Sequence, residues 1–144
     1  MLLRTVAAQT FITCDAPARL IWATKKKPTF APGYGLRNTD FRLPLTPYLA
    51  LSAKFEDGFD ETVDVNEEYL GHFNRGTLMA ADRFVFHHAK EFFFLTENNR
   101  VGTLDDAMAL HKRAHDARTR SVSTVKQGDA FVTVTRNPNA ALDS

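Results

Sequence analysis

The chain has 144 residues, the length of one ordinary domain, and its 44% hydrophobic and 24% charged residues match an average globular protein. These figures exclude a disordered chain and a coiled coil. The net charge of +1 supplies no global field that would concentrate nucleic acid or anionic lipid. The lone cysteine, Cys14, excludes an internal disulfide and a multi-cysteine metal site.

The N-terminus has a short apolar start at residues 1–4, which superficially resembles the beginning of an export signal. Gln9 and Thr10 interrupt the apolar run after a few residues. No segment of the chain approaches the roughly 20 apolar residues that a membrane span requires. The sequence therefore predicts no membrane association and a cytoplasmic location.

Two strands are predicted near the N-terminus, over residues 9–14 and 19–24, because both stretches are rich in β-branched and aromatic residues. Asp15 and Pro17 separate them and are typical of a turn. The long stretch from Lys25 to Asp40 that follows is predicted to be an irregular loop. Loops of that length are uncommon in compact domains and are often functional or disordered.

Two further strands are predicted over residues 41–45 and 48–55. Pro44 and Pro47 cannot take central ladder positions, so this part of the chain is either an edge or a bend between strands. The acidic segment 56–61 is predicted to be a turn.

The first predicted helix begins at a capping box formed by Asp64 and Glu67 and runs to about Arg83. Apolar residues recur along it at the spacing of a core-facing stripe. The members of this stripe are Leu70, Phe73, Thr77, Ala80 and Phe84. Residues 92–95, four consecutive apolar residues, fit a buried strand or an apolar helical turn equally well, because periodicity does not distinguish the two.

A second helix is predicted from Thr103, as its N-terminal cap, to about Arg118 or Arg120, with acidic residues in the first turn. Alternating polar and apolar residues over 121–126 and 130–136 then predict a β-hairpin.

These elements together predict a single α+β domain over residues 1–136, followed by a frayed tail at 137–144. The predicted domain has a small, mainly antiparallel sheet of about five or six strands packed with two principal helices. The C-terminal hairpin either completes that sheet or leaves an open edge.

Three stretches of the chain resemble a known family in their order and spacing. They are Phe11–Pro17, Leu43–Pro47, and Asn74 followed by Ala80–Phe86. Over about residues 8–90 the chain is similar to the C-terminal half of the bacterial domain of unknown function 4238 family. Cys14 and Ala16 stand where that family has Ser and Asn, and the family's His-rich N-terminal half has no counterpart here. The resemblance implies no established activity.

One candidate catalytic pair is Asp15 with a histidine, most simply His88. A carboxylate beside an imidazole makes a general base, which would suit a hydrolase or a nuclease. Asp15 is equally explained as a turn residue. His87 and His88 follow an aromatic strand and are predicted to face opposite sides, which excludes simple chelation by the adjacent pair.

A metal site would need His111 and His115, which lie one helical turn apart. No Glu follows His111 as it does in a metalloprotease helix, and both imidazoles also fit the boundary of the core. We therefore predict no metal. No phosphate-binding glycine motif is present, so no cofactor is predicted.

A nucleic-acid site would use the loop of Lys25, Lys26 and Lys27, with Tyr34 available for stacking and Arg37 for a phosphate contact. A run of three lysines is also typical of a solvated loop. This function remains an alternative.

The chain contains 12 Phe, and several of them cluster between residues 84 and 94. These rings either fill a Phe-rich core or leave apolar area for a partner. The preferred prediction is a non-enzymatic protein-interaction module, such as a small inhibitor or accessory protein of bacterial, phage or mobile-element origin. It would bind a protein partner or a second copy through an aromatic patch or an open sheet edge.

Overall fold

The computed structural model describes residues 1–6, 8–23, 32–55, 61–89, 91–119, 122–127 and 130–135. The helices are α1 (Glu67–Ala80) and α2 (Leu104–Thr119). The strands are β1 (Leu2–Thr5), β2 (Thr13–Cys14), β3 (Arg19–Trp22), β4 (Thr39–Thr46), β5 (Leu49–Lys54), β6 (Thr62–Val65), β7 (Val85–Phe86), β8 (Val122–Gln127) and β9 (Ala130–Thr135).

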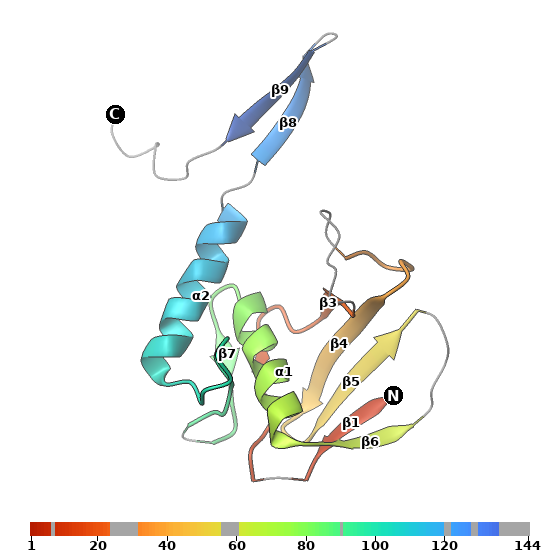
Figure 1. Ribbon diagram of the computed structural model, residues 1–144, viewed down its shortest axis with the longest axis vertical. Coiled ribbons are helices and arrows are strands. Elements are labelled where there is room, and N and C mark those ends of the chain that lie inside the picture. Colours follow the sequence, from red (N-terminus) through yellow and green to blue (C-terminus); the bar gives the residue numbers. More distant parts are fainter. Residues whose placement is uncertain are drawn as a thin grey trace.

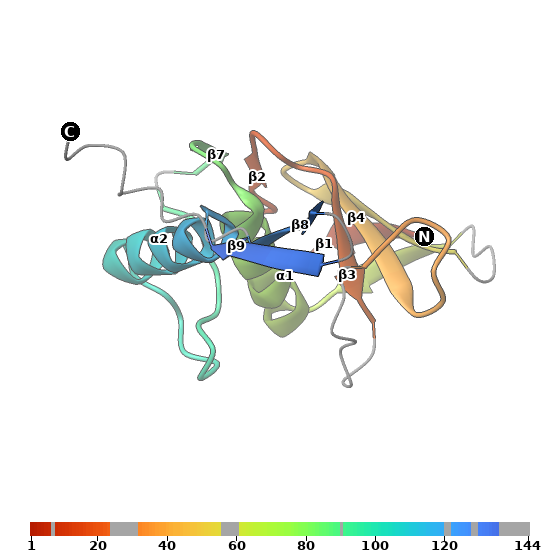
Figure 2. The ribbon, with the colours of Figure 1, turned by 90° about the horizontal axis from the view of Figure 1, so that it is seen from above.

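The main sheet has five strands in the order β3-β4-β5-β1-β6 (Figure 1). All of its pairs are antiparallel except β1 with β6, which are parallel. Both helices lie on the same side of this sheet, with α1 between the sheet and α2 (Figure 2). The predicted α+β class, with two helices and a mainly antiparallel sheet, is confirmed.

Two strands of the main sheet, β1 and β6, were not predicted. The two faces of β1 both carry leucine. Leu2, which pairs with Leu51, lies on one face, and Leu3, which pairs with Ala50, lies on the other. A four-residue run with apolar residues side by side has no period-2 signal. In β6 the polar residues Thr62 and Asp64 alternate with valines, and the parallel partner lies far away in the sequence.

The strand predicted over residues 9–14 is shorter in the structure, where only β2 forms a ladder, with β7. The residues before β2 bind the side chain of Asn74 instead. Its Oδ1 accepts a hydrogen bond from the backbone N–H of Ile12 (3.1 Å), and its Nδ2 donates one to the carbonyl of Thr10 (2.8 Å). An amide side chain therefore takes the place of a neighbouring strand.

Pro44 lies in β4 at a position that behaves as an edge. Strand β3 pairs with β4 only from Thr39 to Arg42, so Pro44 has a neighbouring strand on one side only. Since proline has no N–H to donate, it fits there, whereas between Thr39 and Arg42 it would interrupt a strand that is paired on both sides. The pairing of β4 with β5 shifts register between Pro44 and Thr46.

The predicted capping box of α1 is wrong. The cap is Asn66, whose Oδ1 accepts a hydrogen bond from the backbone N–H of Tyr69 at 2.8 Å. Asp64 lies in β6, where it pairs with Arg4 at 2.6 Å. The helix also ends at Ala80, before the predicted Arg83.

The helix α1 contributes to two core clusters. The first lies between α1 and the sheet and consists of Leu3, Phe11, Ala50, Val65, Leu70 and Phe73. The second lies between α1 and α2 and consists of Ile12, Leu78, Phe94, Ala107 and Leu110. Phe84, predicted as part of the helix stripe, lies beyond the end of α1 and is exposed.

The segment after α1 is mostly neither strand nor helix. Val85 and Phe86 form β7, and Leu95 makes an isolated bridge with Val101. Phe94 is buried because it sits against Gly102, where no side chain competes for the space.

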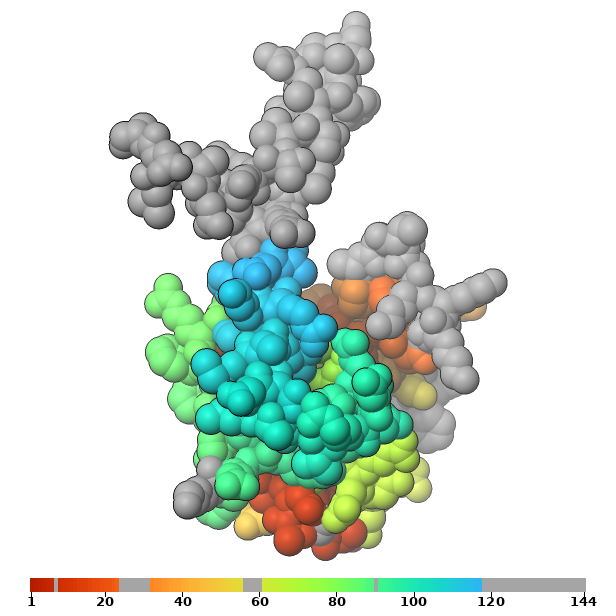
Figure 3. Space-filling view, turned by 60° about the vertical axis from the view of Figure 1, so that its left-hand side comes forward, coloured from red at the N-terminus to blue at the C-terminus, as the bar shows by residue number. Residues whose placement is uncertain are grey.

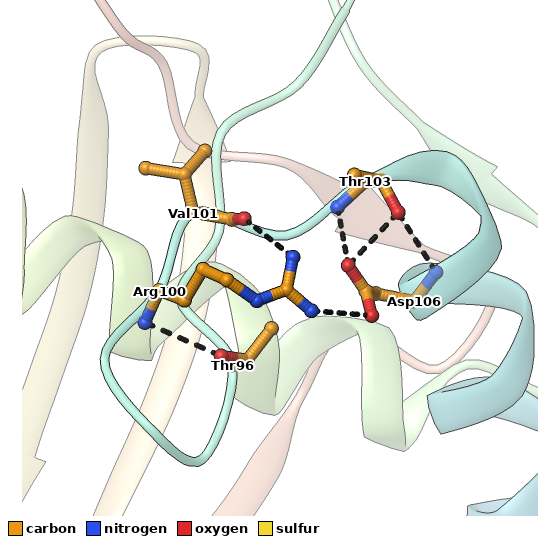
Figure 4. A network of polar contacts seen from close by, with 5 residues as sticks. All are labelled: Thr96, Arg100, Val101, Thr103 and Asp106. Carbon is orange, nitrogen blue, oxygen red and sulfur yellow. Dashed lines mark hydrogen bonds and ion pairs between the residues drawn. The ribbon is translucent and has the colours of Figure 1, made fainter.

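The start of α2 is a reciprocal cap, as predicted for Thr103. Asp106 accepts hydrogen bonds from the N–H and the hydroxyl of Thr103, both at 2.8 Å, and its own N–H donates to that hydroxyl (Figure 4). An acceptor three residues into the helix satisfies donors that the helix leaves unpaired.

The C-terminal hairpin is present as β8 paired antiparallel with β9. Four predictions fall wholly or partly outside the described residues: the first part of the loop at 25–40, most of the acidic turn at 56–61, the tip of the hairpin at 128–129, and the tail at 137–144. Among the described residues, no helix combines the length and the apolar character needed to cross a membrane.

Candidate functional site

An apolar groove of about 330 Å³ lies where three segments meet, and we call it the aromatic groove. The segments are the one leading into β2, the β4–β5 turn, and the one containing β7. The residues that line it are Phe11, Ile12, Thr13, Pro44, Leu45, Thr46, Pro47, Phe86, His87 and His88. Its volume lies at the lower end of the range for ligand-binding pockets.

Two local structures fix the walls of the groove. The β4–β5 turn is closed by the hydroxyl of Thr46, which accepts hydrogen bonds from the N–H groups of Tyr48 (3.1 Å) and Leu49 (3.0 Å). On the opposite wall, Phe86 pairs with Thr13 in the β2–β7 ladder. Hydrogen-bonded turns and ladders position the apolar side chains, so the groove does not depend on a mobile loop.

Large apolar side chains remain in water around this groove. The exposed fractions are 60% for Phe84, 54% for Phe86, 51% for Tyr48 and 49% for Leu45. Phe84 and Phe86 lie with ring centroids 6.4 Å apart. In the space-filling view the light-green segment after α1 forms a projection beside α2 (Figure 3). A contiguous exposed apolar area of this kind marks an interaction site more often than it marks ordinary surface.

The two adjacent histidines both contribute to the groove, although they were predicted to face opposite sides. The strand β7 ends at Phe86, so strict alternation does not extend to them. Their contacts still differ. The His88 ring lies 6.4 Å from that of Tyr48, while His87 lies 5.1 Å from Phe92 and its Nδ1 bonds the carbonyl of Ala89.

Asp15 acts as a cap for the backbone that follows α1. Its carboxylate accepts hydrogen bonds from the N–H groups of Asp82 (2.9 Å), Arg83 (2.8 Å) and Phe84 (3.3 Å). Desolvation raises the pKa of Asp15, but these backbone donors outweigh it and hold that pKa below its ordinary value. A carboxylate held ionised in this way is a poor proton acceptor, and among the described residues no hydrogen bond joins it to His88.

A polar cavity of about 250 Å³ lies beside the N-terminal half of α2. Its charges are largely neutralised within the fold, because Arg75 pairs with Glu97 at 2.7 Å and Arg100 pairs with Asp106 at 2.8 Å (Figure 4). Hydrogen bonds from Arg100 and Thr103 hold the pKa of Asp106 far below its usual range. This arrangement suits a structural ion-pair network.

The candidate metal pair, His111 and His115, lies on α2 with ring centroids 6.5 Å apart. Within the described part of the chain, no group of three His, Cys, Asp or Glu side chains gathers to hold a metal ion. Two imidazoles alone leave a tetrahedral site incomplete.

The candidate nucleic-acid residues separate into two groups. Lys25, Lys26 and Lys27 lie outside the described residues. Arg37 and Tyr34 are both exposed, and the Tyr34 ring lies 6.4 Å from that of Phe41. Because the three lysines are outside the described residues, the nucleic-acid site stays a prediction.

Sequence reasoning left the phenylalanines between residues 84 and 94 open as core or as spare aromatic area, and it did not point to Leu45 and Tyr48 at all. These two residues flank a proline-containing turn about 40 positions earlier in the chain. The available signal was that turn, since connections between strands run over the surface of a protein.

Comparisons of the chain with family models, with curated proteins and with solved structures find no match. The resemblance to the domain of unknown function 4238 family therefore stays a prediction.

Proposed function

We propose that the chain is a non-enzymatic protein-interaction module that holds an extended apolar segment of another protein in the aromatic groove. The observation that carries this proposal is the exposure of Phe84, Phe86, Tyr48 and Leu45 around one preformed groove. Aromatic side chains are enriched among the residues that dominate binding energy, and their low side-chain entropy limits the cost of ordering them.

The shape of the site supports an extended occupant. Within the described chain, β7 pairs with β2 only, so it has a ladder partner on one side. A peptide strand added beside β7 would gain main-chain hydrogen bonds and place alternate side chains in the groove. His87 and His88 give the groove a polar rim, which is the usual border of an apolar interface.

A role as a small inhibitor or accessory factor of bacterial, phage or mobile-element origin extends this proposal. The resemblance to a bacterial family supports the origin. A cytoplasmic location is supported by the single cysteine, which leaves the chain no internal disulfide of the kind common in exported proteins.

The test compares three forms of the full chain: the unsubstituted chain, a groove variant and a control variant. Each form serves as bait for protein partners and for a displayed library of extended peptides. The groove variant is Phe84→Ser with Phe86→Ser. The control variant is Leu104→Ser with Met108→Ser, which removes two equally exposed apolar side chains from α2. We expect the groove variant to weaken binding of the selected ligand at least about tenfold, since truncating a hot-spot residue costs about 2 kcal/mol or more and a tenfold change corresponds to about 1.4 kcal/mol.

The control variant is expected to bind as the unsubstituted chain does. Equal binding by the groove variant, with its circular dichroism unchanged, contradicts the groove as the binding site. Catalytic turnover that persists in the groove variant but is lost in His88→Ala would instead favour an enzyme.

A further inference from the structure

Positive charge gathers on one part of the main sheet, where β3, β4 and the end of β5 lie side by side. Residues that pair directly across two antiparallel strands project to the same face. Arg19 pairs with Arg42, and Asp40 pairs with Lys54. This face is turned toward α1, because the guanidiniums of Arg19 and Arg42 lie 4.7 and 5.8 Å from the ring centre of Phe73. The two pairs carry three positive charges and one negative charge, so this part of the sheet has an excess of positive charge.

The guanidinium of Arg42 makes no hydrogen bond to the described part of the chain, although its side chain is only 17% exposed. Asp40 is its ion-pair partner, but Oδ2 of Asp40 lies 3.7 Å from Nη2, beyond the length of a hydrogen bond. Nε of Arg42 and Oδ1 of Asp40 are both buried and unpartnered. A guanidinium has five N–H donors, and burying donors without acceptors is costly. Arg42 therefore lacks an acceptor that the described chain does not supply.

Arg19 increases the positive charge without supplying that acceptor. Its Nη2 donates to the carbonyl of Phe73 at 2.7 Å, so its guanidinium is fixed against α1. Desolvation, and then the charge of Arg42, lower the pKa of Arg19 to about 10. The two guanidiniums therefore repel each other inside the fold, and an anion placed beside Arg42 would relieve that repulsion.

Arg42 lines an open cavity of about 370 Å³ between β4 and the start of α1, which we call the arginine cavity. The other lining residues are Asn66, Glu68, Tyr69 and His72. The walls are held by regular structure, because Arg42 is paired with strands on both sides and the N–H of Tyr69 donates to the Asn66 cap. The volume falls within the range of small-ligand pockets.

The chemistry of the lining selects the kind of anion. A planar guanidinium matches the two oxygens of a carboxylate through parallel hydrogen bonds. The central carbon of Arg42 lies 5.3 Å from the ring centre of Tyr69, so an apolar body beside the carboxylate would meet that ring. Glu68 is an exposed acid at the same cavity, and it repels a phosphate dianion about twice as strongly as a monoanion. A singly charged carboxylate fits all three features.

We propose that the arginine cavity binds a small organic monocarboxylate, with its carboxylate on the Arg42 guanidinium and its apolar body along the Tyr69 ring. The ligand supplies the acceptor that Arg42 lacks and offsets the excess positive charge of the sheet. The arginine cavity and the aromatic groove share no lining residue, so this proposal and the proposed function can fail independently.

The first experiment titrates the full ¹⁵N-labelled chain with benzoate, a monocarboxylate with a flat apolar body, and follows the backbone amide resonances. We expect saturable shifts that are largest at Arg42 and residues 66–72, with a dissociation constant of about 1 mM or lower, as for a fragment-sized ligand. Benzamide, the neutral analogue, is expected to bind at least tenfold more weakly. Shifts that do not saturate, or that centre elsewhere, overturn the proposal without any variant, and so does equal binding of benzamide.

Inorganic phosphate, titrated in the same way, separates a carboxylate site from a general anion site. We expect phosphate to bind at least tenfold more weakly than benzoate, because Glu68 opposes its second charge and it has no apolar body to contact Tyr69. Phosphate binding as tight as that of benzoate contradicts the assignment to a monocarboxylate.

Two variants of Arg42 then test the contact itself. Arg42→Met removes the guanidinium, and Arg42→Lys keeps a positive charge beside Asp40 but loses the planar pair of donors. Each is expected to weaken benzoate binding at least tenfold, with the circular dichroism of the chain unchanged. The matched control is Arg37→Met, an exposed arginine outside the cavity, which should bind benzoate as the unsubstituted chain does.

The lysine variant keeps the test decisive if Arg42→Met fails to fold. Folded Arg42→Lys that binds benzoate as tightly as the unsubstituted chain contradicts a paired contact between the guanidinium and a carboxylate, and overturns the proposal. Loss of binding in Arg37→Met to the same degree places the site elsewhere and overturns it as well.

Discussion

Asn74 joins three separate parts of the fold through a single buried side chain. Its amide bonds the backbone of Ile12 and Thr10, and also donates to the carbonyl of Phe93 at 2.8 Å. The residue is fully buried in the middle of α1. Buried backbone groups that lack a ladder must be satisfied by some other partner, and here one side chain satisfies three of them.

The first prediction concerns the replacement Asn74→Ala. It leaves the N–H of Ile12 and the carbonyls of Thr10 and Phe93 without this partner, and each unsatisfied buried group costs about 1–3 kcal/mol. We expect the free energy of unfolding, measured in urea, to fall by about 3 kcal/mol or more. The matched control is Asn66→Ala, which removes only a helix cap at an exposed position and should cost about 1 kcal/mol. Equal losses for the two variants would contradict the structural role of Asn74.

The role of Asn74 was beyond prediction from local patterns. Its partners Ile12 and Thr10 lie 62 and 64 positions earlier in the sequence. A polar residue on the apolar stripe of a helix gives no indication of which backbone it meets. The sequence pointed to this asparagine only through the family resemblance.

Arg19 is a charged residue whose contacts could not be predicted from local patterns either. It was predicted only as the first position of a strand, yet its guanidinium donates to the carbonyl of Phe73 at 2.7 Å and lies 4.7 Å from the centre of that ring. Desolvation, with the nearby charge of Arg42, lowers the pKa of Arg19 to about 10. Gly76 leaves the room for this side chain on α1.

At the scale of elements, the strands with strong local signals were predicted and those that depend on distant partners were not. β3, β4, β5 and α2 lie close to their predicted bounds. β1 and β6 form because each completes the hydrogen bonds of the other, which neither segment signals alone. The misplaced cap of α1 has a similar cause, because the carboxylate of Asp64 is already bound to Arg4 across the sheet.

The aromatic groove was predictable only in part, because only one of its walls has a local sequence signal. The cluster of phenylalanines near residue 84 indicated spare apolar area, but the opposite wall comes from the β4–β5 turn. Which face of the main sheet packs against α1 was not predictable, because Leu2 and Leu3, like Leu20 and Ile21, place apolar residues on both sides of a strand. Such runs are typical of strands covered on both faces.

The second prediction concerns Asp15, which ties β2 to the segment between α1 and β7. Its pKa is lowered in the folded state, so the unfolded chain binds its proton first as the pH falls. The stability that Asp15 contributes is therefore complete above the unfolded pKa of about 3.9 and is lost as the pH falls through the lower folded value. We expect Asp15→Asn to be less stable than the unsubstituted chain at pH 7 and the difference to shrink below about pH 4.

Thermal unfolding followed from pH 7 down to pH 3 measures this difference. The control is Leu104→Ser, which replaces an exposed side chain on α2 without changing a titratable group, so its stability difference should not change between pH 7 and pH 3. A gap between Asp15→Asn and the unsubstituted chain that is constant with pH would show that the charged carboxylate does not stabilise the fold.

At the scale of the whole molecule, α1 separates two cores that differ in their surroundings. The first core cluster has the sheet on one side and α1 on the other, while the second relies on α1 and α2. The helix α2 has many exposed positions, and its contact with the rest of the fold depends on Ala107, Leu110 and the ring of Phe94. Few buried side chains therefore hold α2 against the rest of the described fold.

This arrangement predicts that α2 opens as a local unit, and Gly102→Ala tests it. A methyl group at Gly102 would overlap the ring of Phe94, which is buried in the second core cluster. Overpacking of this kind costs about 1–3 kcal/mol. Since Phe94 belongs to the second cluster, we expect hydrogen exchange of the α2 amides to accelerate more than that of the β4 and β5 amides.

The counterpart is Ala50→Val, which adds two methyl groups to the first core cluster beneath α1. This variant is expected to accelerate exchange in the sheet and in α1 together, because both form the walls of that cluster. If Gly102→Ala instead lowers protection by the same factor in α2 and in the sheet, the two clusters unfold as one cooperative unit. In that case α1 transmits the strain from one core to the other, and α2 is not a separate unit of stability.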